Sequence, residues 1–183
     1  MGPNFRHFVP NVGFDTMGKH RLFNQRCIHV TNCQVAKNNS MKIIDLPNGW
    51  FLRLDPGDEF IDSLKLFADS RNVKFAGIVS GVGMIERARM GFFCVPKDDY
   101  DVFDLDDGPY DLSGVSGNIS QFVGQNWPHL HIVTNKMGGE THSGHVLSAI
   151  CYITAEIFIV DYSGFPVIRQ KNPGLPASRL DYG

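Results

Sequence analysis

The chain is poor in the features that would place it outside the ordinary globular proteins. Its 183 residues contain only 4 cysteines, too few and too scattered for the disulfide framework of a small secreted domain. No apolar run approaches the roughly 20 residues that a membrane-spanning helix needs. The first 40 residues also lack the continuous apolar core of a secretory signal. These absences predict a cytoplasmic protein with reduced thiols.

Basic charge is also scarce over most of the chain. The net charge is −2, but residues 1–40 hold five basic side chains and one acidic side chain, so the remainder is distinctly acidic. Seven acidic residues crowd one segment: Asp98, Asp99, Asp101, Asp104, Asp106, Asp107 and Asp111. A DNA-binding surface normally concentrates Lys and Arg. Residues 41–183 show no such concentration.

The periodicity of the sequence divides the chain into three parts. Residues 1–40 have neither helical nor strand spacing and are interpreted as an irregular leader, with Met41 as an alternative natural start. An organised pattern covers residues 41–170, which we expect to form one domain. Residues 171–183 have little periodicity and predict a C-terminal tail on the surface.

One segment has the spacing of an amphipathic helix. Asp58 is a candidate N-cap, apolar residues then recur every three to four positions, and the helix is expected to end near Asn72. The other organised segments indicate strands at 50–54, 73–80, 84–95, 100–105, 112–122, 129–134 and 146–160. A turn is expected at Gly81–Gly83, and the early part of 146–160 could be helix or strand. One helix among many strands predicts an α+β fold with a largely antiparallel sheet.

The strongest chemical signal is a pair of histidines followed by a third after a glycine-rich stretch. In a strand, alternate side chains point the same way, so His129 and His131 project from one face. The stretch 136–144 can fold back and bring His145, or less favourably His142, to the same place. Three imidazoles suit zinc and leave a fourth position for water or substrate. Nickel, copper or iron accept the same ligands.

Glu156 is a second candidate functional residue. It lies in an otherwise apolar strand segment, where a carboxylate is costly unless it is paired. It could act as acid or base on a metal-bound water, or orient a ligating histidine. An ion pair with Arg53, Arg87 or Arg89, within the sheet or across a subunit boundary, explains it equally well.

A further group of cysteines and histidines occurs in the leader. His20, Cys27, His29 and Cys33 are close in sequence, but their spacing matches no strong zinc pattern. The spacing therefore does not favour a second metal site.

A set of short motifs follows the same order as in a known family. The motifs are Leu-Arg-Leu-Asp-Pro-Gly-Asp at 52–58, Gly-Ile-Val-Ser-Gly-Val-Gly at 77–83, Leu-Ser-Gly at 112–114, Ser-Gly-Asn-Ile at 116–119, Pro-His-Leu-His at 128–131, Gly-His-Val at 144–146 and Thr-Ala-Glu at 154–156. Together they resemble the PPC (plants and prokaryotes conserved) domain, also called DUF296. The resemblance extends over roughly residues 41–170.

This resemblance implies a single α+β domain that assembles as a homotrimer. It also implies a metal site in the prokaryotic members, formed by the histidines that correspond to His129, His131 and His145. Plant members bind A·T-rich DNA through an attached AT-hook, an Arg-Gly-Arg core flanked by proline that enters the minor groove. The nearest segment here, Arg87-Ala88-Arg89, lacks the glycine and the prolines. DNA is therefore a partner by family association, without support from the charge.

The sequence thus favours a trimeric metal-binding PPC-domain protein with a regulatory or DNA-associated role. A metal-dependent enzyme is the alternative, with a three-histidine site and Glu156 as acid or base. A third interpretation, that the histidines only support subunit packing, also stays open at this point, because histidines are often core or surface residues without a ligand.

Overall fold

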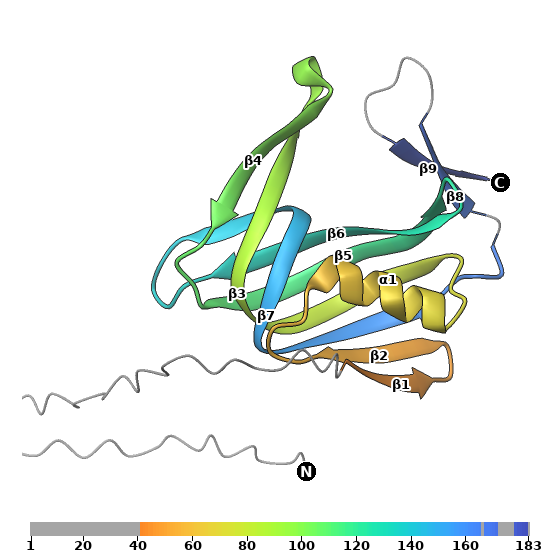
Figure 1. Ribbon diagram of the computed structural model, residues 1–183, viewed down its shortest axis with the longest axis horizontal. Helices are drawn as coiled ribbons and strands as arrows, with labels where there is room; N and C mark the ends of the chain where they lie inside the picture. Colours follow the sequence, from red (N-terminus) through yellow and green to blue (C-terminus); the bar gives the residue numbers. More distant parts are fainter. Residues whose placement is uncertain (1–40, 166, 172–177, 183) are drawn as a thin grey trace, which may run out of the picture. The chain divides into compact units, whose positions relative to one another are not determined.

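The computed structural model describes residues 41–165, 167–171 and 178–182 (Figure 1). The predicted leader, with its group around Cys27, lies outside the described residues. The elements in chain order are β1 (Lys42–Leu46), β2 (Gly49–Leu54), α1 (Phe60–Ser70), β3 (Ala76–Cys94), a short 3-10 helix (Val95–Lys97), β4 (Asp99–Leu105), β5 (Tyr110–Phe122), β6 (Gln125–Asn135), β7 (Thr141–Asp161), β8 (Val167–Lys171) and β9 (Ser178–Tyr182).

The predicted helix is confirmed as α1, but its N-cap is Glu59 rather than Asp58. The Glu59 carboxylate accepts a hydrogen bond from the backbone N–H of Asp62 at 2.7 Å, which satisfies one of the free donors of the first turn. The Asp58 carboxylate instead closes the preceding turn by accepting from the Asp55 N–H at 2.9 Å. No helix among the described residues is long and apolar enough to cross a membrane.

One long strand replaces the two strands predicted on either side of Gly81–Gly83. β3 continues through this segment and pairs with β7, with register shifts between Ile78 and Ser80 and again after Gly83. A Cβ atom on Gly83 would lie 2.1 Å from the Thr154 carbonyl oxygen, so a glycine is needed where the two backbones approach. The expected turn is therefore an irregularity within a continuous strand.

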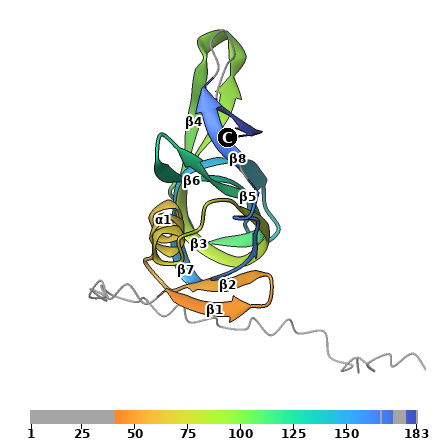
Figure 2. The ribbon, with the colours of Figure 1, turned by 90° about the vertical axis from the view of Figure 1, so that its right-hand side faces the viewer.

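Four long strands pair in a closed cycle. β3 pairs with β5, β5 with β6, β6 with β7, and β7 again with β3, all antiparallel. Figure 2 shows these strands curving around a common axis, with α1 at one side. β1 and β2 extend the sheet beyond β7, and β3 and β4 form a two-stranded ribbon that projects from the rest (Figure 1). The described residues thus form a single domain with a mostly antiparallel sheet and one α-helix, as predicted.

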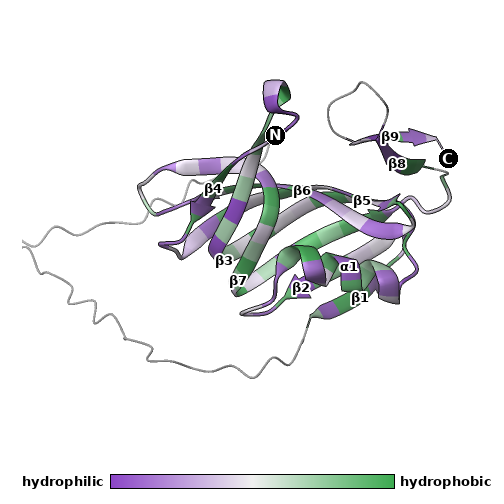
Figure 3. Cartoon of the chain, turned by 45° about the horizontal axis from the view of Figure 1, so that its top comes forward, coloured by the Kyte–Doolittle hydropathy of each residue, from purple (hydrophilic) through white to green (hydrophobic). Residues whose placement is uncertain are grey.

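The core lies between α1 and the strands. Phe60, Leu64 and Phe67 are fully buried on one side of the helix, and the ring of Phe67 meets that of Trp50 edge-on at 5.2 Å. The strands contribute alternate residues to the same core, and hydrophilic and hydrophobic bands accordingly alternate along them in Figure 3. The helix spacing read from the sequence therefore identified one wall of the core.

The end of the chain contains two further strands, β8 at the end of the predicted domain and β9 within the predicted tail. β8 pairs in parallel with β5 at Gln121 and Phe122, and antiparallel with β9. This pairing brings Arg169, in the middle of β8, against the strands that carry the histidines. It is the one parallel pairing among the described strands.

Candidate metal centre

Two of the predicted histidines share one face of β6. Leu130 and Ile132 point into the core, with 0% and 1% of their surface exposed, so His129 and His131 project from the opposite face. The predicted alternation along this strand is therefore confirmed.

The third histidine comes from β7 through a short hairpin. β6 ends at Asn135 and β7 begins at Thr141, and the register places His145 directly opposite His131. Residues 141–144 of the glycine-rich stretch are thus paired strand, and residues 136–140 form a short connection. His142 lies opposite Thr134, away from the other three.

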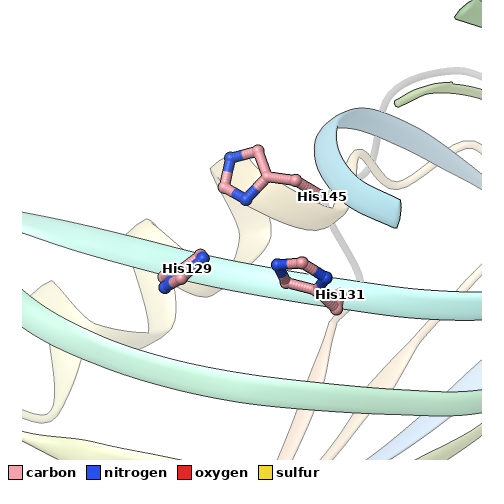
Figure 4. A group of neighbouring side chains, drawn as sticks. All are labelled: His129, His131 and His145. Atoms are coloured by element: carbon pink, nitrogen blue, oxygen red, sulfur yellow. The ribbon is translucent and has the colours of Figure 1, made fainter. Parts of the chain in front are cut away.

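The three imidazoles converge. Their ring centroids are 5.0 to 5.5 Å apart, and each ring offers one nitrogen such that these three atoms all lie within 4.8 Å of one another. Figure 4 shows His145 facing the two histidines of β6. Within the part of the chain that the structure describes, this is the only group of three or more potential ligands close enough to share a metal ion.

The atoms present fit a metal ion. Nδ1 of His145 is buried and makes no hydrogen bond with the described residues, and in Figure 4 this nitrogen lies on the side of the ring that faces His129 and His131. A buried nitrogen without a partner costs free energy, and coordination would remove that cost. Three histidine nitrogens are a ligand set that zinc accepts readily.

The surroundings keep two of these rings neutral. Burial lowers the pKa of His129 to about 4, and the nearby positive charge of Arg169 adds to this effect. Burial, with help from His131, also lowers the pKa of His145 to about 4. A metal ion binds only the neutral imidazole, and both side chains are uncharged at neutral pH.

Arg169 is a site residue that sequence reasoning missed. Its guanidinium donates to Oδ1 of Asn118 at 3.0 Å and to Nδ1 of His129 at 3.3 Å. It also donates to Oγ of Ser120 and to the carbonyl of Ser178, both at 3.3 Å. Only the pairing of β8 with β5 brings this arginine to the histidines, and no spacing or motif in the sequence signals that pairing.

The contact between Arg169 and His129 has a chemical consequence. A guanidinium can only donate, so Nδ1 of His129 accepts and the neutral ring carries its proton on Nε2. A metal ion at Nε2 must displace this proton, whereas a metal ion at Nδ1 must displace Arg169. His129 is therefore the most costly of the three ligands to engage.

A cavity of about 800 Å³ adjoins the histidines. Tyr100 of β4 lies in its wall and stacks on His145, with ring centroids 4.7 Å apart and planes 18° from parallel. Serine side chains and an apolar surface that includes Val82 and Phe92 make up much of the remaining wall. The described residues that line this cavity include no carboxylate. Its size is typical of a small-molecule site.

Glu156 lies outside the histidine cluster and the cavity wall. It is half-buried on β7, opposite Arg53 on β2 and Val82 on β3. The arginines considered as its partners pair elsewhere within this chain: Arg53 with Asp55 at 2.8 Å, Arg87 with Glu86 at 3.6 Å and Arg89 with Asp104 at 3.2 Å. The structure therefore brings the three histidines together but not Glu156.

A glycine supports the position of His129. The backbones of the paired strands β5 and β6 approach closely at Gly117, where a Cβ atom would lie 2.0 Å from the His129 carbonyl oxygen. No other residue fits without moving the backbone that carries the histidine. Two residues of the Ser-Gly-Asn-Ile motif thus have a role at this site. Gly117 allows the close approach to β6, and Asn118 accepts a hydrogen bond from Arg169.

The fold and the histidine cluster define a class, that of single-domain α+β proteins with a converging set of imidazoles beside a cavity. The model of the Plants and Prokaryotes Conserved (PCC) domain matches residues 46–163. The chain therefore belongs to the Plants and Prokaryotes Conserved domain family, as the motifs predicted. A comparison with curated proteins finds no match.

Solved structures of similar fold come from bacteria and archaea. A Bacteroides thetaiotaomicron protein described as a candidate DNA-binding protein is 26% identical, with a TM-score of 0.73 over 79% of this chain and 99% of that chain. A plant- and prokaryote-conserved protein of Pyrococcus horikoshii is 25% identical, with a TM-score of 0.66 over 76% and 94% of the two chains. A metal-containing protein of Archaeoglobus fulgidus is 26% identical, with a TM-score of 0.64 over 77% and 96%.

Proposed function

We propose that this protein binds a divalent transition metal ion, with zinc as the first candidate, through His129, His131 and His145. The observation that carries the proposal is the convergence of three ring nitrogens within 4.8 Å of one another. The similarity to the metal-containing protein of Archaeoglobus fulgidus supports it. We assign the bound ion a regulatory or structural role in a protein of the reducing cytoplasm.

We further propose that the protein acts as a homotrimer. β7 exposes apolar side chains that lie outside the cavity wall, among them Tyr152, Ile153 and Phe158. Exposed apolar surface of this kind is typical of an interface between subunits. We propose that these side chains form the interface between the subunits of the trimer.

A metal-dependent enzyme is the second candidate, and the adjoining cavity favours it. When bound, a metal ion with three histidine ligands can polarise a carbonyl group or activate a water molecule. The cavity wall would hold a substrate beside it, with Tyr100 and the serine hydroxyls available as hydrogen-bonding groups. Glu156 is a candidate acid or base in an assembly that brings it to the cavity of a neighbouring subunit.

DNA is a possible partner by comparison with the proteins described as DNA-binding. The charge of this chain supports only weak, non-specific attraction. The arginines that most nearly resemble a hook, Arg87 and Arg89, are engaged with Glu86 and Asp104, and phosphate contacts need free cationic groups. We therefore place metal binding ahead of DNA recognition.

The test is elemental analysis of the untagged protein. We expect about one metal ion per chain in the wild type and loss of most of it in His131→Ala, because two histidines seldom hold zinc tightly. His142→Ala is the matched control, since this histidine lies on the same hairpin but outside the cluster. Light scattering of the same samples measures the oligomer. Metal retained in His131→Ala, or lost equally in His142→Ala, would contradict the assignment.

A further inference from the structure

Arg169 carries a positive charge that the described residues do not neutralise. Only 7% of the residue is exposed, yet the four groups of described residues that its guanidinium contacts are an amide, a hydroxyl, a backbone carbonyl and an imidazole, all without negative charge. A buried charge is costly unless an opposite charge accompanies it. Burial correspondingly lowers the pKa of the arginine.

The charge of Arg169 acts on the cavity. Its guanidinium binds His129, which lines the cavity together with Tyr100 and His145. The wall itself offers no carboxylate among the described residues. A metal ion held by three neutral imidazoles would add further positive charge at this point. Both the arginine and the metal ion therefore need an anion that the described part of the chain does not supply.

The shape of the cavity indicates what else this anion contains. Apolar side chains, among them Val79, Phe92 and Val133, line the cavity together with the histidines. Ser116 lies opposite His131 in the pairing of β5 and β6, where its hydroxyl can donate to an anion. A hydrated inorganic ion would leave the apolar wall unused, whereas an organic acid with a hydrophobic body would cover it.

We infer that the cavity binds a small organic carboxylate, with its negative charge beside the histidines, where Arg169 contributes positive charge from behind His129, and with its apolar body along the wall. This inference rests partly on the proposed metal site, because a bound metal ion strengthens the need for an anion. Arg169 supplies its share of the attraction with or without the metal ion. The ligand class is thus set by charge and by shape together.

The experiment is calorimetric titration of the zinc-loaded protein with benzoate and with benzamide. The two molecules have nearly the same shape, but only benzoate is charged. We expect benzoate to bind at least about tenfold more tightly, because hydrogen bonds to charged groups are roughly twice as strong as neutral ones. Equal affinity for the two molecules, or no binding of benzoate, would overturn the inference.

Variants of the arginine test the source of the preference. In the metal-free protein, where no metal ion contributes charge, Arg169→Gln should bring the affinity for benzoate down to that for benzamide, and Arg169→Lys, which keeps the charge, should retain most of the preference. Arg87→Gln is the matched control at an exposed arginine paired with Glu86 and should bind benzoate as the wild type does. A preference for benzoate that survives in Arg169→Gln would overturn the role of Arg169. If Arg169→Gln does not fold, as judged by circular dichroism, the wild-type comparison and Arg169→Lys decide.

Titration of the metal-free protein separates this inference from the proposed function. If zinc does not bind but benzoate is preferred in a manner that depends on Arg169, the metal site is wrong and the carboxylate site is upheld. If zinc binds with one ion per chain and benzoate is not preferred, the metal site is upheld and the carboxylate site is overturned.

Discussion

The two faces of β6 carry side chains of different chemistry. One face presents Leu130 and Ile132 to the core, where burial stabilises the fold. The other presents His129 and His131 to the cavity, where burial lowers the pKa of His129 and an arginine adds positive charge. The residues on one face of this strand thus stabilise the fold, whereas those on the other face reduce its stability. Such a costly face is typical of a functional site.

The largest effect is expected from replacing neighbouring residues on the two faces. Leu130→Ala should lower the free energy of unfolding by about 2–5 kcal/mol, because it leaves a cavity in the core. His131→Ala should change the stability of the metal-free protein by less than about 1 kcal/mol, because the side chain is largely exposed. Urea denaturation of both metal-free variants measures the difference. Comparable losses would show that the two faces are not energetically distinct.

A second effect is expected from acid. The pKa values of His129 and His145 are about 4 in the folded protein and about 6.5 in an unfolded chain. Above pH 6.5 both states are neutral and these histidines have no effect. Between pH 6.5 and about 4 the unfolded chain binds protons that the folded protein does not, so the stability of the metal-free protein should fall in this window.

Glutamine at positions 129 and 145 tests the source of this acid effect. The double variant His129→Gln/His145→Gln should lose less stability than the wild type over the same window, as followed by thermal unfolding at several pH values. The same change at His142, outside the cluster, is the control. An unchanged slope in the double variant would show that other groups cause the loss.

The smallest effect is expected on the ribbon of β3 and β4, away from both faces of β6. Arg89 and Asp104 pair across it at 3.2 Å, with about half of each side chain exposed. Exposed ion pairs contribute about 0–1 kcal/mol, so Arg89→Ala should lower the free energy of unfolding by no more than this. The loss should shrink further in high salt. A larger loss would mean that the ribbon supports the fold more strongly than its surface position indicates.

These comparisons explain how much of the molecule the sequence could predict. The apolar spacing of α1 and the alternation along β6 are local patterns, and both predicted elements were found. His145 could be placed because only a short connection separates it from β6. Arg169 could not, because its position depends on β8 pairing with a strand that lies far earlier in the chain. Long-range pairing of this kind leaves no periodic trace in a single sequence.

The misplaced turn at Gly81–Gly83 has a similar cause. Glycines punctuate turns in most sequences, but here Gly83 accommodates the approach of β7, which is not visible from the residues around it. The N-cap was displaced by one residue because Glu59 also accepts from the backbone N–H of Ala149 at 3.0 Å. Both errors arose where a distant part of the chain decided the local structure.

The closed cycle of strands also has a consequence for the order of events during synthesis. β2 joins the rest of the sheet only through β7, which lies at the opposite end of the domain sequence, and β3 pairs with the same strand. Folds that depend on such distant pairings form slowly, because the entropy of closing long loops is lost before any stabilising contact forms. Until β7 has left the ribosome, His145 is not available to the site and the cycle of strands cannot close. Metal capture and completion of the fold should therefore be nearly simultaneous, and both should come late.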